Sequence, residues 1–170
     1  MDRAETWLQV RASVSFLFLC ALVLSIACLT TLARADFETG EAAYQRGDYA
    51  TALREWQPLA MQGNAMAQAR LGGLFHHGQG VPQDYVQARQ WYERAAARGS
   101  ATAHVNLGRL YESGHGVRQD VVLAYKWYTL GAAHGDPLGA ELGDALAKRM
   151  TPAQLFQAQQ RVREWKPATK

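Results

Sequence analysis

A gapless internal repeat of 36 residues constrains this chain more than any other feature. Residues 65–100 align with residues 101–136 without a gap, and 17 of the 36 positions are identical. Chance matching would give only a few identities, so the register of the two copies is secure. Self-similarity at a period of roughly 20 to 50 residues is typical of proteins in which each unit stacks on its neighbours to bury its apolar face. The sequence therefore predicts a stack of repeated units.

Each copy marks its own helix boundaries. A Gly followed by a helix-capping residue recurs at 36-residue intervals, as Gly63-Asn64, Gly99-Ser100 and Gly135-Asp136. Such a pair ends one helix and caps the next. The first copy thus predicts a helix from Ala65 to Gly78, a Gly-x-Gly-Val loop, and a second helix capped by Asp84. The second copy repeats this hairpin, with Gly114 and Asp120 in the same places.

The residues that recur at matching positions predict the packing. Small side chains, which let helices approach closely, recur at Ala67, Gly72, Ala88 and Ala96 and again at Ala103, Gly108, Ala124 and Ala132. Large side chains, expected to fill the core, recur at Leu71, Leu74, Phe75, Trp91 and Tyr92 and again at Leu107, Leu110, Tyr111, Trp127 and Tyr128. We expect both tryptophans to contribute strongly to stability.

The flanking segments are suited to cover the ends of the two repeats. Residues 36–64 have the spacing of a tetratricopeptide-like hairpin with a shorter turn. Residues 137–170 predict capping helices, because Thr151-Pro152 begins a capping box. In the helix that follows, apolar residues spaced by three or four predict one buried face, at Leu155, Ala158, Val162 and Trp165.

Residues 1–35 have the pattern of an export signal. Arg3 and Arg11 precede the uncharged apolar stretch 13–32, and Ala33-Arg34-Ala35 offers a small-residue cleavage site. We therefore expect cleavage after Ala35 and a mature chain in the periplasm or secreted. Because Cys20 and Cys28 lie in this segment, the mature chain would have no disulfide.

Two alternatives stay open for the same segment. The apolar stretch is about 20 residues long, which is enough to span a bilayer, so residues 13–32 could instead anchor the protein in the inner membrane. Lipidation of Cys28 is the second alternative, although the preceding Ser25-Ile26-Ala27 lacks the Leu expected in a lipobox.

The repeat resembles the Sel-one-like repeats, relatives of the tetratricopeptide repeats. The family pattern appears here as Leu107-Gly108, Tyr111, Gly114-His115-Gly116-Val117, Asp120, Ala124, Trp127-Tyr128, Ala132-Ala133 and Gly135. The preceding copy departs only by Phe75 in place of the Tyr. The resemblance implies an all-α fold, a short right-handed α-solenoid of antiparallel helix hairpins. It also implies a non-catalytic adaptor or scaffold for protein–protein interaction in the bacterial periplasm or envelope, since members of the family typically assemble or regulate other proteins.

Positions where the two copies differ are the candidates for partner binding. In related solenoids the first helices of the hairpins line a concave groove, and structural residues must recur in every unit whereas a recognition surface need not. The positions of this face at which the copies differ are Met66, Ala69, Gly73, His76, His77, Thr102, Val105, Arg109, Glu112 and Ser113. We expect a protein or peptide partner there. Drift of exposed positions explains the same differences equally well.

Other functions fit the sequence less well. Tyr44 and Tyr85, expected to be exposed, suggest cell-wall or peptidoglycan binding as an alternative. Some disulfide-rich relatives are associated with β-lactam binding or hydrolysis, but neither Ser100 nor Ser113 opens a Ser-x-x-Lys motif, so we expect no enzyme.

Composition and residue spacing point away from other ligands. A net charge of +3 without a Lys/Arg run favours no nucleic-acid partner. The adjacent pair His76-His77 lacks the i, i+4 spacing of a helical metal site, so we expect no metal or cofactor. Contact with a membrane is expected only through the N-terminal segment, if it is retained.

Overall fold

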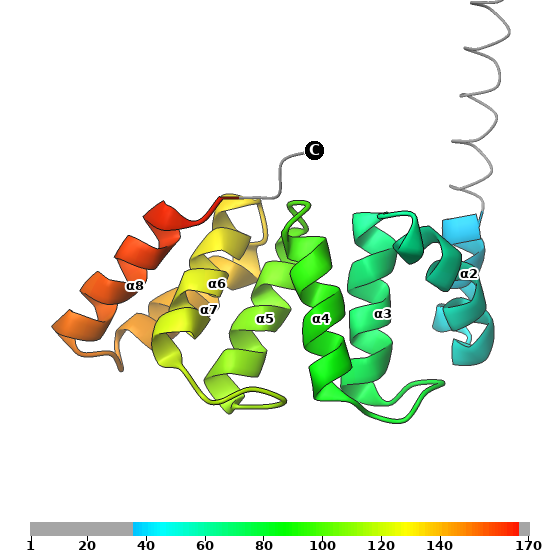
Figure 1. Cartoon of the computed structure of the whole chain (residues 1–170), viewed down its shortest axis with the longest axis horizontal. Coiled ribbons are helices and arrows are strands. Elements are labelled where there is room, and N and C mark those ends of the chain that lie inside the picture. The colour runs from blue at the N-terminus through cyan, green and yellow to red at the C-terminus, as the bar shows by residue number, and fades with distance from the viewer. Residues whose placement is uncertain (1–35, 167–170) are drawn as a thin grey trace, which may run out of the picture.

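The computed structural model describes residues 36–166, and all of its regular secondary structure is helical. The predicted signal segment, residues 1–35, and the last four residues lie outside the described part. A helical segment over residues 36–45 is followed by α2 (Tyr49–Met61), α3 (Ala65–His77), α4 (Tyr85–Ala96), α5 (Ala101–Ser113), α6 (Val121–Ala133), α7 (Pro137–Ala147) and α8 (Pro152–Glu164). The helices follow one another along the long axis, from α2 at one end to α8 at the other (Figure 1). This is the α-solenoid that the sequence predicts.

The helix boundaries predicted from the repeat are confirmed. The side chain of Asn64 accepts a hydrogen bond from the backbone of Ala67 at the start of α3, and Ser100 does the same at the start of α5. Asp84 and Asp120 cap α4 and α6 in the same way. The first helix of each repeat ends at a left-handed glycine, Gly78 with φ 67° or Gly114 with φ 75°.

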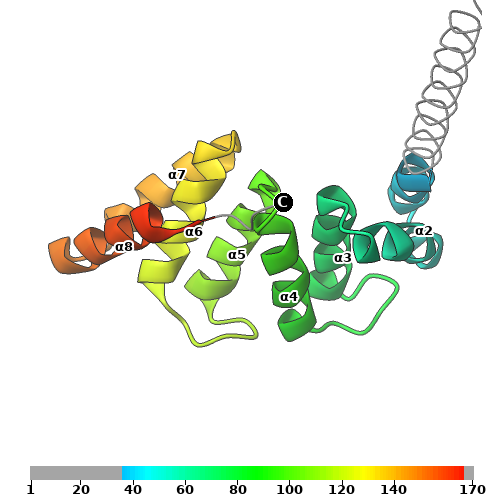
Figure 2. The same cartoon turned by 45° about the horizontal axis from the view of Figure 1, so that its top comes forward.

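Adjacent helices pack in the order of the chain, and α3, α4 and α5 lie side by side in both Figure 1 and Figure 2. At the centre of each repeat a tyrosine fills the space that a glycine leaves. Tyr92 is 1% exposed and Tyr128 is 0% exposed. A Cβ added at Gly72 would lie 2.5 Å from the Tyr92 ring, and one at Gly108 would lie 2.5 Å from the Tyr128 ring. The prediction of close approach at these glycines is therefore confirmed.

The tryptophans of the repeats differ from the expectation. Trp91 and Trp127 are only half-buried, and each carries a cation on its ring: Arg94 lies 4.7 Å from the centroid of Trp91, and Lys126 lies 4.2 Å from that of Trp127. The tyrosine that follows each tryptophan takes the central position instead. The difference is one of phase on the helix, since neighbouring residues point about 100° apart.

The hairpin loops rest on the preceding repeat. A Cβ at Gly80 would lie 2.8 Å from the Cβ of Tyr49 at the start of α2, and one at Gly116 would lie 2.7 Å from that of Tyr85 at the start of α4. The second glycine of each Gly-x-Gly loop thus lets one repeat sit against the next, which is a structural use of the motif.

Helices from the flanking segments cover the two ends of the stack. At the N-terminus Trp56 is 0% exposed and its indole N–H donates to the carbonyl of Phe37 at 3.2 Å. At the C-terminus Thr151 and Gln154 form the capping box of α8. This helix packs on α6 and buries Ala158. No helix within residues 36–166 has the length and apolar character needed to cross a bilayer.

Candidate functional site

Two hollows follow one another along the contact between α3 and α5, the first helices of the two repeats. We call this surface the α3–α5 groove. The first hollow has a volume of about 330 Å³. It is lined by Phe37, Tyr44, Met66, Ala69, Arg70, Gly73, His77, Tyr92, Ser100, Thr102 and Asn106. The second hollow, of about 310 Å³, lies at the C-terminal ends of the two helices. It is lined by His76, Arg109, Glu112, Ser113 and His115.

Nine of the ten residues that sequence reasoning selected line these hollows. Met66, Ala69, Gly73, His77 and Thr102 belong to the first hollow, and His76, Arg109, Glu112 and Ser113 belong to the second. The structure places these side chains together on one surface. Whether they bind a partner stays a prediction.

Val105 is a correction to the predicted set. It is 2% exposed and packs in a core cluster with Tyr128 and Leu146. The equivalent Ala69 is only partly buried at the groove surface. α7 explains the difference, because it contacts α5 and its Leu138 covers the cluster that holds Val105. A valine here is a core residue and presents no surface to a partner.

Sequence reasoning missed several lining residues. Arg70 and Asn106 occupy the same position of the two copies and differ, so the rule that selected their neighbours would also have found them. Tyr92 was assigned to packing because it recurs as Tyr128. Phe37 and Tyr44 come from the N-terminal hairpin, and their place beside α3 depends on tertiary packing.

The floor of the first hollow holds a tyrosine hydroxyl that has no partner within the described part of the protein and opens into the hollow. Tyr92 lines the hollow, yet its hydroxyl makes no hydrogen bond to any group within residues 36–166. It lies 3.9 Å from where a Cβ would stand at Gly73, so this glycine leaves the hydroxyl open to the groove. Burial raises the pKa of the Tyr92 phenol well above its usual value of 10.0, so it remains a hydrogen-bond donor.

The second repeat satisfies the same hydroxyl internally. Tyr128 donates a hydrogen bond to Oε2 of Glu112 at 2.8 Å. Oε1 of Glu112 accepts from Arg149 at 3.0 Å, which ties α5 to the end of α7. The residue equivalent to Glu112 in the first repeat is His76. This carboxylate is therefore a structural group as well as part of the hollow.

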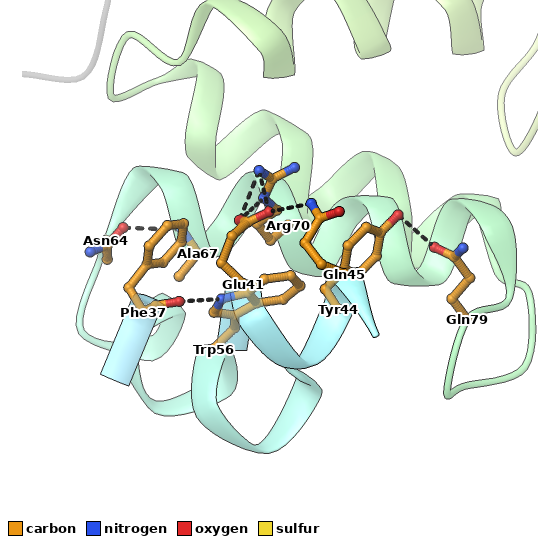
Figure 3. A network of polar contacts seen from close by, with 9 residues as sticks. All are labelled: Phe37, Glu41, Tyr44, Gln45, Trp56, Asn64, Ala67, Arg70 and Gln79. Atoms are coloured by element: carbon orange, nitrogen blue, oxygen red, sulfur yellow. Dashed lines mark hydrogen bonds and ion pairs between the residues drawn. The ribbon is translucent and has the colours of Figure 1, made fainter. Parts of the chain in front are cut away.

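The charges along the groove are unevenly compensated. Arg70 is held by Glu41 through two hydrogen bonds, of 2.8 and 2.9 Å, and Figure 3 shows this pair beside Tyr44, whose hydroxyl donates to Gln79. Arg109 is exposed and forms no ion pair with any residue of the described range 36–166. The positive charge that remains available to a ligand is thus at the second hollow.

The pKa of His76 is affected by the positive charges around the second hollow. Burial, with smaller contributions from the neighbouring His77, His115 and Arg109, which repel a proton, lowers its pKa to about 4. The ring stands edge-on to Tyr85, which in turn stacks on His115 with the ring centroids 4.5 Å apart. At neutral pH His76 is therefore uncharged, and the walls of the second hollow are aromatic and cationic.

Tyr44 and Tyr85 are a second correction. Both were expected to be exposed aromatics suited to a cell-wall surface, but both are half-buried. Tyr44 also packs against Trp56, with ring centroids 5.7 Å apart. Tyr44 lines the first hollow, and Tyr85 stacks on His115.

Other features of the described residues carry less chemistry. A third hollow, of about 730 Å³, lies beneath the hairpin loop of the second repeat and beside Gln154 of α8. It is separate from the groove, and its Arg89 is already paired with Glu93. Ser100 is the cap of α5, and Ser113 donates to the carbonyl of Arg109. Within residues 36–166 no three His, Cys, Asp or Glu side chains are placed to hold a metal ion.

These features define a class of protein: an α-solenoid of helix hairpins with a groove between successive first helices. The Sel1 repeat profile matches residues 65–100 and 101–136. A solved Sel1 repeat protein from Oxalobacter formigenes is 37% identical, with a TM-score of 0.59, over 66% of this chain and 88% of that one. The chain belongs to the Sel1 repeat proteins.

A second solved structure is similar over a longer stretch. It is a protective antigen of uropathogenic Escherichia coli with an SLR fold, 30% identical, with a TM-score of 0.74 over 78% of this chain. This chain spans only 29% of the antigen's length. No curated protein matched the sequence. Sel1 repeat proteins generally mediate protein–protein interactions, and their solenoid is typically a non-catalytic scaffold.

Proposed function

We propose that this protein is an exported adaptor of the bacterial periplasm or envelope that holds a segment of a partner protein in the α3–α5 groove. One observation carries the proposal: the positions at which the two repeats differ gather along two adjoining hollows, with the unpaired Tyr92 hydroxyl at the floor. A surface of this kind offers apolar contact, hydrogen bonds and charge to a partner. The composition of residues 1–35 supports export.

Site-specific crosslinking in living cells tests the groove. A photoreactive amino acid replaces Met66, which is 59% exposed in the first hollow, or Phe156, which is 58% exposed on α8 outside it. We expect a defined crosslinked partner from position 66 and none of the same mass from position 156. Crosslinks of equal yield at both positions, or none at 66, would contradict the groove assignment.

A blocking variant shows whether the crosslink depends on the hollow. Gly73→Leu places a side chain in the first hollow, and its Cβ meets nothing closer than the Tyr92 hydroxyl at 3.9 Å. We expect it to fold normally and to abolish the crosslink at 66. Glu112 is unsuitable for this purpose because it also holds Tyr128 and Arg149.

Export is tested separately by N-terminal sequencing of the protein from the periplasmic fraction. We expect the mature chain to begin at Asp36. A chain of full length that remains in the membrane fraction would favour the anchored alternative and leave the groove assignment untouched.

A further inference from the structure

We infer that the α3–α5 groove selects an extended peptide segment with an acidic side chain beside an apolar one, the carboxylate lying against Arg109 in the second hollow. The inference rests on the proposed function and adds the chemistry of the partner. Three observations carry it: an unpaired cation, a hydroxyl donor without a partner among the described residues, and an apolar hollow, all along one groove.

The unpaired Arg109 favours a carboxylate of the ligand at the second hollow, and the described residues of the first hollow offer no such cation. Arg70 in the first hollow is neutralised by the bidentate pair with Glu41, and Glu112 in the second hollow is neutralised by Arg149. Arg109 therefore leaves a net positive charge at the second hollow, next to His115. A guanidinium binds carboxylate oxygens through two parallel hydrogen bonds, which makes an acidic side chain the matching group.

The Tyr92 hydroxyl suits the backbone of an extended segment. It is at the floor of the first hollow, and Arg109 lines the second hollow from α5. A hydroxyl that has no partner within residues 36–166 can donate to an acceptor such as a peptide carbonyl. Asn106, which also lines this hollow, can both donate and accept.

The apolar part of the first hollow favours an apolar residue next to the acidic residue of the peptide. Met66 is 59% exposed there, and Phe37 and Tyr44 form another part of the wall. Exposed methionine is an adaptable surface for apolar side chains. A peptide with its acidic residue at Arg109 therefore presents a Leu, Met or aromatic residue to this wall.

Selection from a displayed library of random nonapeptides against the full chain tests the inference. We expect the selected peptides to be enriched in Asp or Glu close to Leu, Met or aromatic residues. Fluorescence anisotropy with one labelled selected peptide then measures affinity. We expect a loss of about tenfold for its Glu→Gln version, consistent with a charge-assisted contact.

Variants of the protein locate each contact. Arg109→Ala should weaken binding by about tenfold, and Tyr92→Phe by roughly fivefold with unchanged stability. Gly73→Leu should abolish binding. The matched control is Arg118→Ala, an exposed cation in the loop outside the groove, which should leave affinity unchanged.

The acidic-peptide inference and the groove as its site are contradicted by different results. Enrichment of Lys or Arg, no charge preference, no selected peptide at all, or equal binding to Arg109→Ala would each overturn the acidic-peptide inference. Binding that is insensitive to Gly73→Leu would overturn the groove as its site. The crosslink from position 66 in cells tests the scaffold function independently, since a partner could be held there without any acidic residue.

Discussion

The two repeats bury the same tyrosine in the same way but treat its hydroxyl differently. In the second repeat Tyr128 donates to Glu112, and Arg149 holds that carboxylate in place. In the first repeat His76 occupies the carboxylate position, and the Tyr92 hydroxyl has no hydrogen-bond partner within residues 36–166. The second repeat therefore pairs its tyrosine hydroxyl within the protein, whereas the first leaves that hydroxyl for a ligand to satisfy. A repeat can thus keep its fold and still change its chemistry at one helical position.

The glycine–tyrosine contact that both repeats share should show the largest effect on stability. Gly72→Ala and Gly108→Ala each place a Cβ 2.5 Å from the ring of a fully buried tyrosine, so we expect each to destabilise the protein by about 3 kcal/mol, as overpacked cores do. Urea unfolding followed by circular dichroism measures the effect.

The neighbouring glycine provides the control for that prediction. Gly73→Ala meets only the Tyr92 hydroxyl at 3.9 Å and should be neutral or stabilising by up to about 1 kcal/mol, because alanine favours a helix over glycine. Similar destabilisation at Gly72 and Gly73 would contradict the clash with the buried ring as the cause, and unequal effects at Gly72 and Gly108 would break the equivalence of the two tyrosine sites.

A second difference between the repeats predicts sensitivity to acid. Gln68 of the first repeat donates to the carbonyl of Ala60 at 3.0 Å, whereas its equivalent, His104, is 0% exposed and has neither ring nitrogen paired within residues 36–166. Burial, with a smaller contribution from His134, lowers the pKa of His104 to about 4. The neutral ring stacks on His134 and meets the edge of Trp165.

The sign of the effect follows from that lowered pKa. An unfolded histidine binds a proton near pH 6.5, but the folded one resists until about pH 4, so stability is present above pH 6.5 and is lost as the pH falls. We expect a loss of roughly 2 to 3 kcal/mol from this residue between pH 7 and pH 4. His104→Gln, which copies the first repeat, should remove that part of the acid sensitivity. An unchanged pH profile of unfolding for His104→Gln would contradict this account.

The different pairing of the two tyrosine hydroxyls predicts a smaller effect on stability, and the unpaired tyrosine serves as the control. Tyr128→Phe removes a hydrogen bond to a carboxylate and should cost about 1.5 kcal/mol, whereas Tyr92→Phe removes no internal bond and should change stability by less than about 0.5 kcal/mol. Chemical denaturation of both variants under one set of conditions measures the contrast. Equal losses would show that Tyr92 has a partner in the folded protein.

The sequence predicts the repeated features of the fold and most of the groove surface. Caps such as Asn64 and Asp84 and the packing glycines could be predicted because they act through local geometry and recur in each unit. The burial of Val105 could not, since it depends on how α7 lies on α5. The lack of an internal partner for the Tyr92 hydroxyl was also not predicted. A recurring tyrosine indicates packing, and only the three-dimensional pairing of Tyr128 with Glu112 shows that the two hydroxyls differ.

Converting the first repeat to the second is the most specific test of the comparison. His76→Glu introduces a carboxylate at the position from which Glu112 accepts the Tyr128 hydrogen bond, here within reach of Tyr92. We expect the variant to gain about 1 kcal/mol of stability, because the Tyr92 hydroxyl acquires an acceptor among positively charged neighbours.

The same substitution should abolish binding of an acidic peptide, since the introduced carboxylate satisfies Tyr92 and neutralises Arg109. His76→Ala, which supplies no acceptor, serves as the control and should retain most of the binding without the gain in stability. Thermal unfolding and peptide anisotropy, measured on the same preparations, separate the two variants. If the glutamate and alanine variants are equally stable and bind equally well, the hydroxyl of Tyr92 is not what distinguishes the first repeat.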